Sequence, residues 1–113
     1  MLLHYVPRTR SARPRWLLEE LGVPYELKRL DPKKGETHTP EHRALQPMGH
    51  VRVLTTNDGA LFESAALFLH LADLHPEKKL IGPVGSHARG LAYQWSFYAM
   101  TEVEPVVMKF LAE

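Results

Sequence analysis

The chain has 113 residues, of which 44% are hydrophobic and 24% are charged, which suits one globular domain or a small domain followed by a fragment. Its formal net charge is +1 and it has no cysteine. We therefore expect no binding to nucleic acid or to an anionic membrane, and disulfides, cysteine nucleophiles and thiolate metal sites are excluded. The sequence has no long apolar run and no signal-peptide pattern, so we expect a cytoplasmic protein with no membrane-spanning segment.

The N-terminal part of the chain predicts a strand, a helix and a second strand. Residues 2–6 are short and mostly apolar, as in a buried strand. A helix follows, for which Ser11 is the candidate N-cap, and Pro14 would lie in its first turn, where a missing N–H costs little. Gly22 would end that helix as a C′ residue. Residues 25–30 then alternate roughly between apolar and polar, which predicts the second strand.

The next part of the chain predicts a hairpin between two helices. The sequence Asn57-Asp58-Gly59 is a strong hairpin turn signal. The elements expected around it are, in chain order, a polar loop over 31–40, a short helix over 40–46, strands over 51–54 and 60–62, and a helix over 64–75.

This order of elements predicts an α/β fold in which helices cover a mixed sheet, as in a thioredoxin-like domain over 1–76. Residues 77–86 have the proline, glycine and charge of a linker. A long helix is expected over 87–113, kinked at Pro105. Its apolar residues, which we expect to form a core or an interface, are Leu91, Trp95, Phe97, Tyr98, Met100, Val103, Val106, Val107, Phe110 and Leu111.

Three stretches of sequence carry a resemblance to a known family. RPRWLLEELGVPYEL, LQPMGHVRVL and LFESAALFLHLADLHP follow one another in an order that resembles the N-terminal domain of glutathione S-transferases, over essentially the whole chain. The most specific element is the Glu63-Ser64 pair, which opens a helix after a hairpin. The PMGHV segment before the hairpin is the second. The resemblance implies a thioredoxin-like fold that binds glutathione. It also implies that the helix over 87–113 is the first helix of an all-helical domain that is cut short.

The Glu63-Ser64 pair fits the amino-acid head of glutathione, which has one carboxylate and one ammonium group. A helix N-terminus offers unpaired N–H groups to a carboxylate, Ser64 adds a hydroxyl donor, and Glu63 could attract the ammonium. The alternative is that Ser64 is only an N-cap and Glu63 only a favourable acid in the first turn. The preceding hairpin and the match upstream favour the glutathione interpretation.

The resemblance also implies a contact between glutathione and the chain at Val51. In the family, the residue before a cis-proline pairs its backbone with the cysteinyl amide of glutathione, and Val51 has that position, with His50 beside it as a further binding candidate. Position 52 is arginine, where the family pattern has proline. A cis bond before a non-proline residue costs about 2.5–4 kcal/mol, so we expect the Val51–Arg52 bond to be trans.

A hydroxyl near the first helix would stabilise the glutathione thiolate, as the resemblance implies, and so lower the thiol pKa. Thr9 and Ser11 lie nearest the serine-type positions of the family, and we keep them as joint candidates. Tyr5 is the tyrosine-type candidate. The alternatives are a loop hydroxyl for Thr9, a simple N-cap for Ser11, and a tyrosine packed at the end of the first strand.

Four arginines lie around these hydroxyls, and the first 18 residues contain no acid. Their positive field would favour a thiolate and the glycine carboxylate of glutathione, and Arg13 is the candidate contact. The alternative is a solvated basic turn. The four are Arg8, Arg10, Arg13 and Arg15.

The seven histidines do not predict a metal site. His38 and His42 are four residues apart with Glu41 between them, but Pro40 argues against one helix carrying both. A metal centre would also need a third ligand at suitable spacing. We therefore expect no metal.

Two functions follow from the resemblance. The first is a transferase-type enzyme that uses glutathione as cosubstrate and joins its thiolate to a hydrophobic electrophile. The second is a non-catalytic domain that keeps the fold and binds glutathione or another protein. Whether the chain is an enzyme stays open between them. A homodimer is expected in either case, because nothing else in the sequence can cover the apolar final helix.

Overall fold

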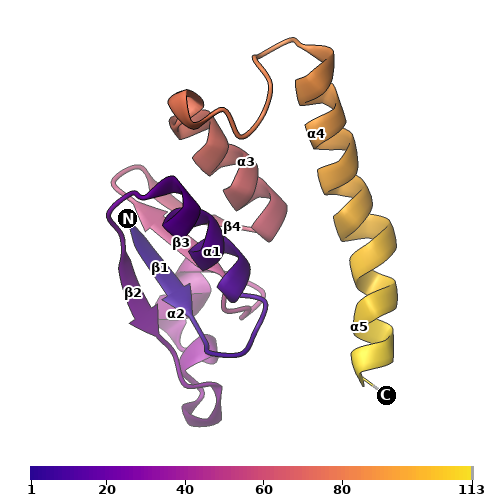
Figure 1. Cartoon of the computed structure of the whole chain (residues 1–113). Helices are drawn as coiled ribbons and strands as arrows, with labels where there is room; N and C mark the ends of the chain where they lie inside the picture. The colour runs from indigo at the N-terminus through magenta and orange to yellow at the C-terminus, as the bar shows by residue number, and fades with distance from the viewer. Residues whose placement is uncertain (113) are drawn as a thin grey trace. The chain divides into compact units, whose positions relative to one another are not determined.

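The computed structural model describes residues 1–112, and the chain divides into two compact units, Met1–Leu71 and Ala72–Glu113. The first unit holds the elements expected of a thioredoxin-like domain (Figure 1). In chain order these are β1 (Leu2–Tyr5), α1 (Ala12–Leu21), β2 (Glu26–Arg29), α2 (Pro40–Leu45), β3 (Val53–Thr56), β4 (Gly59–Phe62) and α3 (Ser64–Leu74).

The four strands form one mixed sheet in the order β2-β1-β3-β4. β1 is parallel to β2 and antiparallel to β3, and β3 is antiparallel to β4. The parallel pair needs a crossover, which α1 supplies. The antiparallel pair of β3 and β4 is joined by the predicted turn at Asn57-Asp58, where Gly59 has a φ of 131°. The mixed sheet expected from the sequence is confirmed.

The hydrophobic core lies between one face of the sheet and the helices α1 and α3. Leu3 and Leu54 from the sheet pack there with leucines of the two helices, and all are fully or almost fully buried. Replacing one such leucine with alanine removes about 2–5 kcal/mol of stability. The helix leucines are Leu18, Leu21, Leu67 and Leu71.

The opposite face of the sheet meets α2. Successive side chains of a strand point to opposite faces, so His4 points away from the face on which Leu3 packs. Its ring meets that of His42 of α2 edge-on, with 5.7 Å between the ring centroids. Two buried histidines therefore form the contact between α2 and the sheet.

Two loops differ in detail from the sequence-based expectation. The polar loop contains two 3₁₀ turns, Pro32–Lys34 and Glu36–His38, because the Asp31 side chain accepts a bond from the Lys33 N–H and Gly35 adopts a φ of 71°. The third strand begins at Val53 rather than at Val51, so the PMGHV segment is a loop.

The second unit begins with the last residues of α3, contains a 3₁₀ turn, Pro76–Lys78, and continues into helices α4 (His87–Tyr98) and α5 (Glu104–Ala112). A π-helical turn, Ala99–Val103, connects the two helices just before Pro105. Proline has no N–H to donate to the carbonyl four residues back and its ring crowds that carbonyl, which explains the wider turn. None of the described helices is both long and apolar enough to span a membrane.

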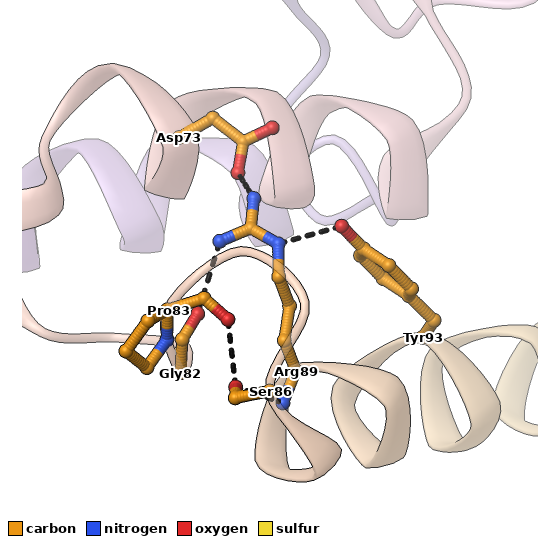
Figure 2. A network of polar contacts seen from close by, with 6 residues as sticks. All are labelled: Asp73, Gly82, Pro83, Ser86, Arg89 and Tyr93. Carbon is orange, nitrogen blue, oxygen red and sulfur yellow. Dashed lines mark hydrogen bonds and ion pairs between the residues drawn. The ribbon is translucent and has the colours of Figure 1, made fainter.

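The segment before α4 is fixed by Arg89, as Figure 2 shows. Its guanidinium donates to the Gly82 carbonyl at 3.0 Å and to the Tyr93 hydroxyl at 2.6 Å, and it pairs with Asp73. The Ser86 hydroxyl accepts from the Arg89 N–H at 3.2 Å as a helix cap. The stretch expected to be a linker, residues 77–86, is therefore bonded to the first turns of α4.

Candidate functional site

The sheet topology brings the three glutathione motifs to one edge. β1 and β4 are both antiparallel to β3, so their carboxyl ends lie at the edge where β3 begins. The register is explicit, because Val53 pairs with His4 on one side and with Phe62 on the other. Three segments leave or enter the sheet next to His4, Val53 and Phe62: residues 6–11, 49–52 and 63–64.

A cavity of about 260 Å³ lies at this edge. It brings together four residues that the sequence singled out: Thr9, Ser11, His50 and Val51. The other residues that line it are Arg10, Pro32, Thr37, Gly49 and Arg52. The remaining candidates, Tyr5, Arg13, Glu63 and Ser64, are not part of its lining.

The hydroxyls of Thr9 and Ser11 form a small network with Val6. The Ser11 hydroxyl accepts from the Val6 N–H at 3.1 Å and contacts the Val6 carbonyl at 2.9 Å. The Thr9 hydroxyl contacts the same carbonyl at 2.8 Å, and the two hydroxyls are 2.7 Å apart. Two hydroxyl hydrogens serve these three contacts, so one of them always lacks a proton.

Burial separates the two hydroxyl residues. Ser11 is 1% exposed and occupies the N-cap position of α1, yet its side chain makes no capping bond. Its hydroxyl is used instead to close the loop onto Val6. Thr9 is exposed, and the bonds of its hydroxyl are part-buried, so Thr9 is the more accessible of the two residues.

Tyr5 and the arginines are spread around this edge rather than gathered in the cavity. Tyr5 ends β1, and its ring lies under the guanidinium of Arg15, 5.1 Å from the centroid, a cation–π arrangement. Arg10 lines the cavity, whereas Arg13 is half-buried in the first turn of α1. Arg8 is exposed in the turn, with a φ of 61°.

The Glu63-Ser64 pair has two unusual features. Glu63 has a φ of 76°, a left-handed conformation that is uncommon for a residue with a side chain and costs about 1–3 kcal/mol. Ser64 is 4% exposed, and its hydroxyl has no hydrogen-bond partner in the described part of the chain. Since α3 begins at Ser64 itself, and its carbonyl bonding begins with Glu63, this serine is not the N-cap. The arrangement leaves a buried donor at the positive end of a helix.

The loop before β3 depends on Gly49. This glycine has a φ of 71°, and a Cβ there would lie 2.8 Å from the His38 ring nitrogen and 3.4 Å from the Thr37 carbonyl. The next residue, His50, is held by its backbone, because its carbonyl accepts from the His42 ring at 2.6 Å. The Val51–Arg52 bond is trans, as expected, since the described residues contain no cis peptide bond.

The histidine pair weighed as a metal site is not joined in the structure. The His38 ring contacts the Arg43 guanidinium at 3.0 Å, while His42 turns toward His50. Across residues 1–112, no group of three His, Asp or Glu side chains is arranged to hold a metal ion.

Two residues near this edge were not foreseen from the sequence: Thr37 and His42. Thr37 had been considered only as part of a polar loop. It lines the cavity together with Arg10, one of the four arginines expected to provide a positive field. His42 gave no local signal, since its partner His50 is identified only by the fold.

Comparison with known proteins identifies the family. A model of the family described as "Glutathione S-transferase, N-terminal domain" matches residues 1–73. A curated zeta-class glutathione S-transferase of Euphorbia esula is 28% identical, over 99% of this chain and 51% of the relative. Glutathione S-transferase GstA of Escherichia coli O157:H7 is 33% identical, over 91% of this chain and 52% of the relative. The chain thus spans about half the length of the curated relatives it matches.

Solved structures give the same result. A glutathione transferase of Methylococcus capsulatus is 32% identical with a TM-score of 0.79, over 90% of this chain and 51% of that one. A transferase homologue from Sulfitobacter, solved with bound glutathione, is 28% identical with a TM-score of 0.77, over 88% and 48%. Ure2p in complex with glutathione has a TM-score of 0.88 at 22% identity, over 97% and 52%, a likeness of fold.

Proposed function

Because this chain belongs to the glutathione S-transferase family, we propose that it binds glutathione at the sheet edge where its three motifs meet. The observation that carries the proposal is the Ser64 hydroxyl, which is buried at the N-terminus of α3 with no partner in the described chain. A buried unpaired hydroxyl costs about 1–3 kcal/mol. A ligand carboxylate that accepts from it and from the free N–H groups of the helix would offset that cost.

The proposed roles follow the three parts of glutathione. Ser64 donates to the γ-glutamyl carboxylate, and the exposed carboxylate of Glu63 attracts the ammonium group. The backbone of Val51 pairs with the cysteinyl amide as a short added strand would. His50 and Arg13 would bind the glycine carboxylate, to which a cationic or N–H donor side chain is suited.

We propose that the chemistry, where it occurs, is conjugation. Thr9 would donate its hydroxyl hydrogen to the glutathione sulfur, which lowers the thiol pKa from about 8.5 and makes thiolate available near neutral pH. The thiolate would attack an electrophilic carbon, the new C–S bond would form, and the leaving group would depart with the bonding electrons. Ser11 would hold Thr9 in place, and Tyr5 is the less favoured sulfur contact because it does not line the cavity that contains Thr9 and Ser11. No metal is needed for this step.

A second candidate is a non-catalytic glutathione-binding domain. It is favoured by the hydroxyl network, because Thr9 and Ser11 already use their hydrogens on Val6 and on each other. A thiolate would have to draw one of them away. Arg52 in place of the family's proline favours the same alternative.

The rest of the assembly is also proposed. We propose domains over 1–76 and 87–113 joined by a linker over 77–86, in a homodimeric cytoplasmic protein. The second substrate would be a hydrophobic electrophile, which in this family is held largely by the helical domain. The support for a dimer is the row of exposed apolar side chains on α4 and α5, which includes Trp95, Phe97, Val106 and Phe110.

Calorimetry with glutathione, followed by an assay with 1-chloro-2,4-dinitrobenzene, tests the proposal. Binding with turnover supports the transferase, and binding without turnover supports the second candidate. If the folded chain does not bind millimolar glutathione, the proposed function is wrong.

A further inference from the structure

His42 makes three hydrogen bonds, of which the one from its ring connects α2 to the loop that carries Val51. Its backbone N–H donates to the Thr39 hydroxyl at 3.2 Å, and its carbonyl accepts from the Gln46 N–H at 2.8 Å. Its ring nitrogen Nε2 is 2.6 Å from the His50 carbonyl oxygen. The side chain is 4% exposed.

The loop between α2 and His50 is also bonded internally. Gln46 accepts twice, from the Gly49 N–H at 3.0 Å through its backbone carbonyl and from the Met48 N–H at 2.8 Å through its side chain. Gly49 has no room for a side chain against His38. These contacts hold the loop from Gln46 to Gly49. The bond from the His42 ring to the His50 carbonyl follows them, directly before Val51.

That last bond acts on the Val51 N–H through the peptide plane. The carbonyl of His50 and the N–H of Val51 belong to one peptide group, which is planar and trans, so the two point in opposite directions. Fixing the carbonyl toward His42 therefore fixes the Val51 N–H away from it. A carbonyl can only accept, so Nε2 of His42 must carry the hydrogen. The other ring nitrogen, Nδ1, is buried without a partner among the described residues.

We propose that His42 is a positioning residue for the glutathione site, because its ring N–H sets the direction of the Val51 backbone at the cavity shared with Thr9 and Ser11. The inference rests on the proposed function, since Val51 is the residue that would pair with the cysteinyl amide. His42 itself touches no ligand. It acts from the opposite face of the sheet, where its ring packs against His4.

A matched pair of variants tests this role. In His42→Gln the side-chain amide reaches the position of Nε2 and can still donate, whereas in His42→Asn it stops about one bond short, at the position of Nδ1. Both variants place a neutral amide in the same buried site, so their effects on packing are similar. The probe is S-methylglutathione, whose sulfur has no proton and cannot complicate the measurement.

We expect His42→Gln to bind S-methylglutathione within about twofold of the parent chain and His42→Asn about tenfold more weakly, the value of one lost hydrogen bond. Thr39→Val is the control, because it removes the cap of α2 without touching His50, and its affinity should stay at the parent level. Equal affinity of the Gln and Asn variants, or a loss in Thr39→Val as large as in His42→Asn, would overturn the proposal.

A second readout separates this proposal from the proposed function. The orientation of the Val51 N–H in the ligand-free chain is measured by its residual dipolar coupling. The coupling should match the parent value in His42→Gln and change in His42→Asn. If the parent chain binds no S-methylglutathione, the proposed function fails, while this coupling still decides the positioning role. An unchanged coupling in both variants contradicts it.

Discussion

The side-chain oxygens of Thr9 and Ser11 lie 2.7 Å apart, and both contact the carbonyl oxygen of Val6. Only Ser11 also accepts from the buried N–H of Val6. The two hydroxyls therefore have different structural roles, although the sequence alone does not distinguish them. Ser11 closes the loop onto Val6, and Thr9 is the more exposed of the two residues.

Replacing these residues should separate stability from chemistry. We expect Ser11→Ala to lower the free energy of unfolding by about 1–3 kcal/mol, because it leaves the Val6 N–H buried and unpaired. Thr9→Ala should cost less stability. It should raise the thiol pKa of bound glutathione by about 1–2 units, because one hydrogen bond to the charged sulfur is lost. Urea unfolding and thiolate absorbance measure the two effects, and Thr9→Ser is the control that keeps the hydroxyl. If the thiol pKa of glutathione bound to Thr9→Ala equals that in the parent chain, the proposed role of Thr9 is wrong.

Ser64→Ala should change stability and binding in opposite directions. In the ligand-free chain the substitution removes a buried hydroxyl that has no partner among residues 1–112, so we expect the free energy of unfolding to stay the same or rise. Glutathione affinity should fall, by about 1.5–3 kcal/mol for a donor to a charged group. Calorimetry and urea unfolding of the same sample check both. Glu63→Gln tests the ammonium contact separately. Unchanged glutathione affinity in both variants would show that the γ-glutamyl group does not bind at Glu63 and Ser64.

Acid should destabilise the fold through His4. Burial is the main cause that lowers the pKa of His4, and the neighbouring His42 and Lys28 lower it further, against the effect of the Val53 carbonyl. An unfolded histidine titrates near 6.5, so below about that pH the unfolded chain binds a proton that the folded chain resists. Stability is therefore complete above this range and declines as pH falls through it. Urea unfolding at pH 7.5 and 5.5 measures the decline, which should be smaller in His4→Gln. An equal decline in that variant would assign it to other groups.

Self-association should depend on the apolar face of the last two helices. Phe110 is 72% exposed and Trp95 is 57% exposed, and exposed apolar side chains gathered on a surface often mark an interface. We expect light scattering at micromolar concentration to show a dimer, and Phe110→Glu to shift it toward monomer. Lys109→Glu, a charge change beside it on a polar position, should leave the dimer intact. A parent chain that is monomeric with α5 ordered would contradict this expectation.

Local signals made most of the first unit predictable. The turn at Asn57-Asp58, the helix end at Gly22 and the periodicity of α1 and α3 depend on residues close in sequence, and the structure confirms them. The site was harder to predict, because it depends on strand order. The bond from His42 to His50 and the turn of Ser11 toward Val6 are set by the packing of the whole unit.

The contacts of Arg89 close the chain on itself from the end of α3 to the second turn of α4. One guanidinium holds Asp73, Gly82 and Tyr93, while Val84 and Gly85 between them are exposed. A protease that cuts at these exposed residues would therefore cut inside this ring of contacts. The segment expected from its composition to be a flexible linker is thus bonded to a single side chain of the helix that follows it, which also pairs with the helix before it.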